Sequence, residues 1–345
     1  MRNDTRKVFN QYAQRLAQIN GAPNAFSTFD VDPSVQQTLE TKIQESSEFL
    51  NRVNMVGVRD MIGEKLGLGI SGPIAGRTDV SQRDRNPSDP TQLDEHEYRC
   101  QSTEFDTFLS WAKLDAWAKF PDFQARVRDA IVRQQALDRI MIGLNGTRAA
   151  KQTDRTKNPM LEDVNVGWLQ QYRANAAARV VDGVQIGKGQ EFQNLDALVY
   201  EAVNSLIDPW YRDNTDLVAI VGRSLMTDKY LPKINEWEQP TESRALDLIM
   251  AAKRFGGQNA MQVPFMPDNA IFITSTENLS IYWQEGSRRR HLVEKPERKR
   301  IVNYESSNDA YVIEDYGFGC LIEGIEFADA DSTDAGTTDT SGSGA

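Results

Sequence analysis

The sequence contains little cysteine and little histidine: its 345 residues include two of each. Cys100 and Cys320 lie far apart along the chain, which excludes a disulfide-rich scaffold and fits a reducing compartment. Two histidines leave few side chains for a zinc site or for a nucleophile activated by an imidazole base. From these shortages we expect no metal, no cofactor and no catalytic residues.

Long apolar runs are absent as well. No stretch approaches the roughly 20 apolar residues that cross a bilayer. The first seven residues, MRNDTRK, lack the apolar region of a secretory signal. The sequence therefore predicts a protein with no membrane partner that is made and kept in a cytoplasm.

Positive charge is scarce, with 39 Lys and Arg side chains against 50 Asp and Glu, a net charge of −11. Nucleic-acid binding draws its affinity from cationic contacts with phosphates, so this balance opposes a general attraction to DNA. Residues 288–300 are the exception, because seven Lys or Arg side chains accompany two Glu there, a local net charge of +5. We expect these cations to meet an acidic face of a neighbouring subunit; the alternatives are a solvated hairpin and a nucleic-acid site. The contact candidates in this run are Arg288, Arg289, Arg290, Arg298, Lys299 and Arg300.

The most informative feature present is an extended arm. Residues 66–70 alternate apolar side chains with glycine, and residues 105–111 alternate apolar with mostly polar side chains, so both are predicted strands. Residues 71–97 between them hold few apolar side chains. Because an isolated two-stranded ribbon is marginal in water, we expect other copies of the same chain to cover it. The contact candidates here are Leu66, Leu68, Ile70, Phe105, Leu109 and Trp111.

Two patterns typical of enzymes fail in their context. Residues 67–72 match G-x-G-x-x-G, the dinucleotide fingerprint, but Pro73 follows and no helix pattern begins there. We interpret these glycines as a bend in the ribbon. Ser224 lies between a predicted strand and a predicted helix, but its surroundings are not G-x-S-x-G.

Three helices are predicted in the first half of the chain. Asp4 caps a short, exposed and detachable helix, and Asp32 with Pro33 begins a second one as N-cap and first-turn proline. The third and longest, residues 121–146, has apolar side chains at three- and four-residue spacing. The expected apolar face of the first helix is Val8, Tyr12, Leu16 and Ile19.

From residue 160 onward helices alternate with short buried strands. Such alternation also occurs in α/β enzymes, so an enzyme of unknown reaction centred on residues 166–277 is the alternative function. The last residues contain four Asp and no basic side chain, and we expect them to be disordered. The predicted helices are 195–206, 224–234 and 242–254, and the predicted strands are 217–221, 270–274, 280–283, 311–314 and 319–327, with a basic hairpin at 287–301.

The order of these parts is itself distinctive: a first helix, an arm, a ribbon, one long helix and an α/β region. The chain also carries a set of specific motifs. They are MRxxTRxxFNxY (residues 1–12), DPSVQQTL (32–39), QESSEFL (44–50), NPML (158–161), VGWLQ (166–170), NLSIY (278–282) and NYES (303–306). With this order and these motifs, the chain resembles the major capsid proteins of P2-like tailed bacteriophages (Peduoviridae). The likeness spans nearly the whole chain short of the tail.

The resemblance implies an α+β fold of the Hong Kong 97 type, with an N-arm, an extended loop, a peripheral domain built around a spine helix, and an axial domain. It places the parts as follows: propeptide 1–29, N-arm 30–53, extended loop 54–112, peripheral domain 113–165 and 278–310, axial domain 166–277 and 311–327, and acidic tail 328–345.

The resemblance also implies a function without enzymatic activity. The chain would assemble with itself into pentamers and hexamers that enclose double-stranded DNA in the virion capsid, after assembly in the host cytoplasm. Its other implied partners are an internal scaffold and maturation protease, a portal protein, and packaged DNA held non-specifically at the inner face. In this family an N-terminal propeptide is removed, and the matching junction is Phe29–Asp30.

Overall fold

The computed structural model describes residues 1–65, 68–70, 75, 77–82, 84–85, 91–93, 97–117, 123–235 and 253–328. The chain divides into two compact units. Unit 1 comprises residues 1–171 and 276–315, and unit 2 comprises residues 172–275 and 316–345. Each unit is thus assembled from sequence segments that are far apart. The finer boundaries of propeptide, N-arm, loop and the two domains stay predictions.

Unit 1 is built on a seven-stranded sheet in the order β1-β16-β17-β15-β2, with β7 and β8 also paired to β17. The long strand β17 is the common partner, because residues 300–306 pair with β16 and residues 309–313 with β15. The strands are β1 (Phe29–Asp30), β2 (Asn54–Val58), β7 (Gln101–Glu104), β8 (Thr107–Ser110), β15 (Leu279–Gln284), β16 (Arg289–Lys295) and β17 (Arg300–Ile313).

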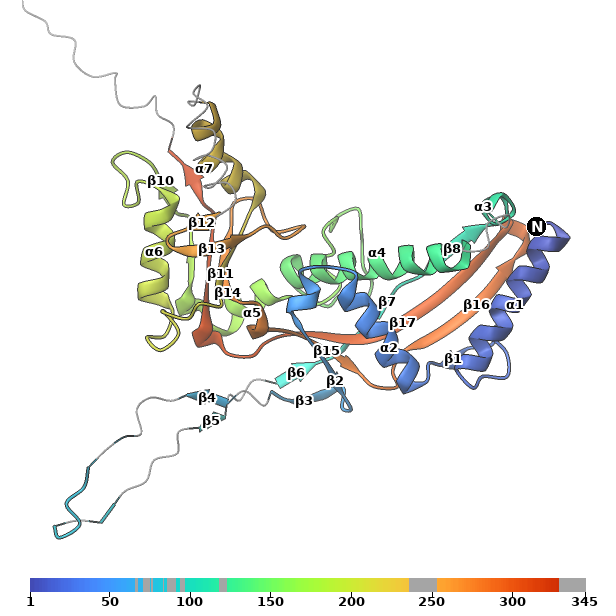
Figure 1. Cartoon of the computed structure of the whole chain (residues 1–345), viewed down its shortest axis with the longest axis horizontal. Coiled ribbons are helices and arrows are strands. Elements are labelled where there is room, and N and C mark those ends of the chain that lie inside the picture. The colour runs from blue at the N-terminus through green and yellow to red at the C-terminus, as the bar shows by residue number, and fades with distance from the viewer. Residues whose placement is uncertain are drawn as a thin grey trace, which may run out of the picture. The chain divides into compact units, whose positions relative to one another are not determined.

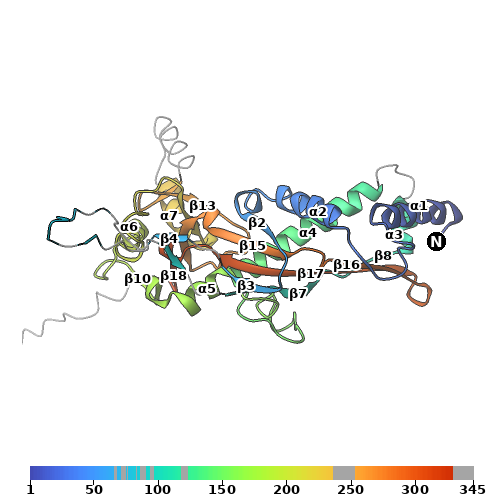
Figure 2. The same ribbon diagram turned by 90° about the horizontal axis from the view of Figure 1, so that it is seen from below.

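Among the described residues, four α-helices lie wholly within unit 1, and α2 and α4 confirm the sequence prediction closely. Helix α2 begins at Pro33, and the Asp32 carboxylate accepts a hydrogen bond from the Ser34 backbone at 2.9 Å. Helix α4 runs beside β17, while α1 and α3 lie near the far end of the β16–β17 hairpin (Figures 1 and 2). The helices are α1 (Asn3–Ile19), α2 (Pro33–Glu45), α3 (Trp111–Trp117), α4 (Phe123–Asn145) and the first residues of α5 (Trp168–Asn175).

The first helix is confirmed, but its predicted face is only partly correct: Tyr12 and Leu16 are half-buried against the core, whereas the other two residues are exposed. Val8 and Ile19 are 37% and 51% exposed. The fully buried stripe is shifted by one position and consists of Phe9 and three smaller residues, Thr5, Ala13 and Ala17. Two alanines on this stripe allow close packing, which a search for large apolar side chains overlooks. The helix is therefore not an exposed appendage but is packed onto unit 1.

The predicted strand 66–70 is confirmed over residues 68–70, but its partner strand differs from the prediction. Strand β3 (Ile62–Glu64) pairs with β6 (Glu97–Arg99), and β4 (Leu68–Ile70) pairs with β5 (Thr91–Leu93), both antiparallel. Residues 105–111 are not part of this ribbon: β8 pairs with β17, and Trp111 begins α3. The alternation of apolar residues correctly indicated a strand, but alternation does not specify the partner strand. Leu66 lies outside the described residues.

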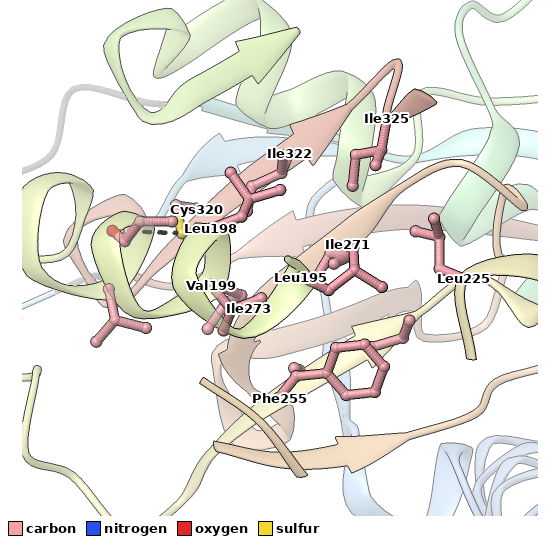
Figure 3. Packing of buried hydrophobic residues seen from close by; sticks show 14 of the residues in the cluster. Leu195, Leu198, Val199, Leu225, Phe255, Ile271, Ile273, Cys320, Ile322 and Ile325 are labelled. Atoms are coloured by element: carbon pink, nitrogen blue, oxygen red, sulfur yellow. Dashed lines mark hydrogen bonds between the residues drawn. The ribbon is translucent and has the colours of Figure 1, made fainter. Parts of the chain in front are cut away.

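Unit 2 contains a six-stranded mixed sheet in the order β12-β13-β11-β14-β18-β9 and a separate β10-β19 pair. Helix α6 contributes Leu195, Leu198 and Val199 to the core over this sheet, where Ile271, Ile273 and Cys320 lie close by (Figure 3). The elements are β9 (Val180–Asp182), β10 (Gln185–Ile186), α6 (Leu195–Leu206), β11 (Leu217–Val221), α7 (Arg223–Asn235), β12 (Arg254–Phe255), β13 (Gln258–Met261), β14 (Ile271–Ser275), β18 (Gly319–Glu323) and β19 (Glu326–Phe327).

Most predicted elements after residue 160 are confirmed. These include α6, α7, β11, β14, β15, β18 and the β16–β17 hairpin. The predicted strand 311–314 is the end of the much longer β17. The predicted helix 242–254 falls mainly outside the described residues, and Arg254 belongs to β12. The tail from residue 329 is outside them too.

Candidate assembly surfaces and processing junction

The junction Phe29–Asp30 forms β1, an edge strand of the unit 1 sheet. Phe29 pairs with Arg290, and Asp30 pairs with Arg289. The Phe29 ring is buried, whereas Asp30 is exposed, with its carboxylate 3.5 Å from the Arg289 guanidinium. An edge strand already has the extended form in which β-addition recognises a chain. One edge of β1 thus pairs with β16, and no described strand pairs with its other edge.

Helix α1 is fixed to unit 1 by apolar and polar contacts. Phe9 packs in a cluster with Leu114 and Ile301, while Ala13 and Ala17 belong to a second cluster with Leu292. Polar contacts flank the apolar stripe. Arg6 donates two hydrogen bonds to the Glu294 carboxylate, at 3.0 and 2.8 Å. The Arg290 guanidinium donates to the Tyr12 hydroxyl at 3.4 Å.

The basic run forms the β16–β17 hairpin, and its side chains divide into two groups. Arg289, Arg298 and Lys299 are exposed. Arg290 and Arg300 are half-buried: Arg290 donates to Asn303 at 2.7 Å, and Arg300 lies 4.8 Å from the centre of the Phe108 ring. The exposed group is available for contacts with other subunits.

Arg288 does not fit the expected role, because its side chain is completely buried. Its guanidinium donates to Glu305 at 2.6 and 2.8 Å, to Glu40 at 2.7 Å and to Gln135 at 2.9 Å. It cannot reach another molecule while unit 1 is folded. The prediction that Arg288 contacts a neighbour is therefore wrong; the residue holds its own unit together.

Arg288 belongs to a buried charge cluster that the sequence analysis missed. Glu40 of α2 also bonds to Arg139 of α4, and Arg139 donates to Asp309 of β17 at 3.1 and 3.2 Å. Ser307 donates to the Asp309 carboxylate at 3.1 Å. Three elements are thus joined through groups with almost no exposed surface. Each charge is paired, as buried ions require.

The pKa directions in this cluster follow from burial and pairing. Burial raises the pKa of Glu40, but the guanidinium groups of Arg139 and Arg288 outweigh it and hold that pKa below its ordinary value. Burial likewise acts on Glu305, whose pKa is lowered overall by Arg288 and Arg290. For Asp309 burial wins over Arg139, so its pKa is raised. The arginines therefore favour the ionised form of Glu40 and Glu305, whereas burial favours the protonated form of Asp309.

The sequence offered one weak signal for this cluster: Glu40 lies three residues before Ile43 and therefore on the same side of the second predicted helix. In the structure Gln36, Glu40 and Ile43 are all buried on one face of α2. A carboxylate on a buried face requires a cationic partner. What the sequence could not supply was the identity of Arg139 and Arg288, which are far away along the chain.

The remaining contact candidates differ in how deeply they are buried and in the element to which they belong. Phe105 is buried, and its backbone donates to Glu305 O at 2.7 Å. Leu109 and Trp111 are partly buried against Phe9 and its cluster. Leu68 and Ile70 lie in β4 of the ribbon. Whether any of these touch another subunit stays a prediction.

Within the described ranges, no group of three or more His, Cys, Asp or Glu side chains is arranged to hold a metal ion. Cys100 and Cys320 are both buried free thiols, and burial raises the pKa of each to about 12, so they are poor nucleophiles at neutral pH. No described helix combines the length and apolarity needed to span a membrane.

The described residues thus combine an α+β core, the short strand pairs β3–β6 and β4–β5, and an N-terminal segment packed on an edge of the unit 1 sheet. Comparison with known proteins identifies the family. Residues 8–325 match the family of phage major capsid proteins of the P2 type. The chain belongs to this P2 family of phage major capsid proteins, and it has the Hong Kong 97-type fold. It is a component of the shell of the virion.

Individual relatives support the assignment over almost the full length. The chain is 46% identical over 344 residues to a protein of Escherichia phage P2 named "Capsid proteins", covering 95% of this chain and 96% of the relative. It is 42% identical over 342 residues to the major capsid protein of Serratia phage KSP20, covering 95% and 98%. A structure of the satellite phage P4 procapsid, including its size determination (Sid) protein, matches with a TM-score of 0.80 and 45% identity, covering 95% of this chain and 99% of that one.

Proposed function

We propose that this chain forms the pentamers and hexamers of an icosahedral phage head that encloses double-stranded DNA. The observation that carries the proposal is the match to capsid proteins over 95% of the chain. In this scheme copies of the chain are the main partner, and a portal protein occupies one vertex. Assembly takes place in the host cytoplasm and involves no enzymatic step by the chain itself.

The contacts of such a shell are individually modest. A standard interface buries roughly 800 Å² per partner. A subunit that contacts several neighbours is bound tightly because the contacts act together. Because each single contact is weak, a misplaced subunit can dissociate. The exposed cations Arg289, Arg298 and Lys299 and the ribbon are the surfaces we assign to these contacts.

Removal of residues 1–29 at Phe29–Asp30, by a protease inside the shell, is the second part of the proposal. The edge position of β1 supports it, because a protease can bind the free edge of an extended strand. Residues 1–29 contain four Lys or Arg and one Asp, so their loss changes the net charge from −11 to −14. A more acidic shell would hold packed DNA without binding it tightly.

Negative-stain microscopy of the purified protein tests the assembly proposal. Rings or closed shells support it, whereas a monomer or small oligomer at every protein and salt concentration contradicts it. Mass spectrometry of finished virions tests the processing proposal. A chain that begins at Asp30 supports the junction, and a chain that retains Met1–Phe29 refutes it.

A further inference from the structure

Helix α1 lies in a groove that is lined by residues of four separate elements of its own unit: α3, α4, β8 and the β16–β17 hairpin. Its buried stripe repeats every four residues, so one narrow face enters the groove while the other faces solvent. An isolated helix of this length is marginal in water. The groove therefore contributes much of what keeps α1 helical.

The groove has polar contacts at defined points, which fix the direction of the helix. At the N-terminal end the helix lacks a side-chain cap of its own, and Asp115 of α3 accepts a hydrogen bond from the Arg2 backbone at 2.8 Å. A carboxylate there also complements the helix dipole. The Arg2 hydrogen bond is the main cause that lowers the pKa of Asp115, so the acceptor is ionised at neutral pH.

Further along, the contacts of α1 are made with β16 and with α3. Arg6 bonds to Glu294 of β16, the Phe9 ring packs on Leu114 of α3, and Tyr12 accepts from Arg290. Reversing the helix would separate all of these pairs. The groove is thus a directional receptor for one amphipathic helix.

The fit is good but not complete. A cavity of about 100 Å³, lined mainly by apolar side chains, remains beside the helix, with Val8 and Phe9 on one wall and Ile131 on another. Unfilled apolar space forfeits dispersion contacts. The exposed Arg6–Glu294 pair adds little in salt. This balance suits a segment that must stay in place and later leave.

We propose that the groove is a binding site for α1 as a separate peptide, so that cutting the chain beyond α1 does not release the helix. The proposal rests on the proposed removal of residues 1–29. It divides maturation into two events, cleavage of the peptide bond and release of the helix. Release then requires the contacts of α1 with Asp115 of α3 and with Glu294 of β16 to break. While it is bound, the helix links these two elements of unit 1.

The test uses the full-length chain with a recognition sequence for a site-specific protease inserted between the exposed residues Pro23 and Asn24. The engineered cut makes the test independent of whether Phe29–Asp30 is the natural junction. After cutting, gel filtration at micromolar concentration should show the released peptide eluting with the protein. A peptide that separates completely would overturn the proposal.

A second measurement introduces amino-acid substitutions into a synthetic peptide and not into the protein, so the substitutions cannot affect folding of the protein. Fluorescently labelled synthetic peptides of residues 1–23 are exchanged into the cut protein and followed by anisotropy. The Phe9→Ala peptide should bind at least about tenfold more weakly than the unchanged peptide, because a buried ring is lost. The Gln14→Ala peptide, changed on the exposed face, should bind like the unchanged one. Equal affinity of the Phe9→Ala peptide would refute a specific groove.

Discussion

The indole ring of Trp168 lies directly over Gly143 of helix α4. A Cβ atom at Gly143 would come within 2.3 Å of the Trp168 ring, closer than any real contact. Trp168 is fully buried, and its Nε1 donates to Ser280 O at 3.1 Å, so the ring is held in place. Glycine inside a helix costs roughly 1 kcal/mol relative to alanine, and the close packing of this ring explains why it is present.

Gly143→Ala is therefore expected to destabilise the protein although alanine is the better helix former. The clash should cost about 1–3 kcal/mol as the ring or the backbone shifts, more than the roughly 1 kcal/mol gained in helix propensity. Chemical denaturation followed by tryptophan fluorescence measures the change. Arg133→Ala, on the exposed face of the same helix, is the control and should be near neutral. A Gly143→Ala protein more stable than the wild type would contradict the packing argument.

Glu40→Gln tests the buried charge cluster. The substitution leaves Arg139 and Arg288 facing a neutral amide, and breaking a buried ion pair costs about 3–5 kcal/mol. Thermal unfolding should show a large drop in Tm. Glu48→Gln is a matched control, because the Glu48 carboxylate is 88% exposed and pairs with Arg52 at 3.0 Å on the surface. If both variants lose the same stability, the cluster has no special role.

Acid stability should depend on Glu305. Its pKa lies below the ordinary 4.5, so the folded state favours the ionised carboxylate. Its contribution to the free energy of unfolding is complete above pH 4.5 and is lost as the pH falls through the lower folded-state pKa. Glu40 acts in the same direction. Asp309 acts oppositely, because its raised pKa means that its contribution increases as the pH falls through that value.

The measurement compares urea unfolding of the wild type and of Glu305→Gln over a pH series through 4.5. The variant is expected to be less stable at neutral pH, with the difference shrinking as the solution is acidified. A difference that stays constant with pH would show that the Glu305 carboxylate is not ionised in a pairing that stabilises the fold.

Charge reversal at the tip of the β16–β17 hairpin should affect assembly without affecting folding. Arg298 and Lys299 are exposed, so Arg298→Glu with Lys299→Glu should leave the Tm within about 1 °C, since exposed substitutions are nearly neutral. Particle yield should fall, and the loss should depend on ionic strength. Lys151→Glu, another exposed cation, serves as the comparison. Normal particle yield from the double variant would show that the tip of this hairpin does not form a subunit contact that assembly needs.

Deletion of residues 71–97 should give a soluble subunit that does not build shells. The unit 1 sheet does not include β3 to β6, so its pairing survives the deletion. Sedimentation velocity separates the two outcomes, free subunits or particles. Particles of normal size from the deleted chain would show that the ribbon is dispensable.

Many elements of the fold followed from local sequence signals. Asp32 with Pro33 determined the start of α2, and the spacing of apolar residues determined α4, because capping and helical periodicity act within one or two turns. The capsid motifs, spread over the chain, indicated the family. The buried face of α1 was harder to predict, because Ala13 and Ala17 form much of it and small residues give a weak apolar signal.

Only the tertiary structure decided which distant segments meet. Alternation in residues 105–111 specified a strand, yet its pairing with β17 depends on residues nearly two hundred positions later. The basic run gave the charge of Arg288, but its burial against Glu40 and Glu305 depends on how α2 and β17 pack around it. The physical reason is that helix capping and apolar periodicity are local properties of the chain, whereas strand pairing, burial and ion pairing depend on the neighbours that folding brings together.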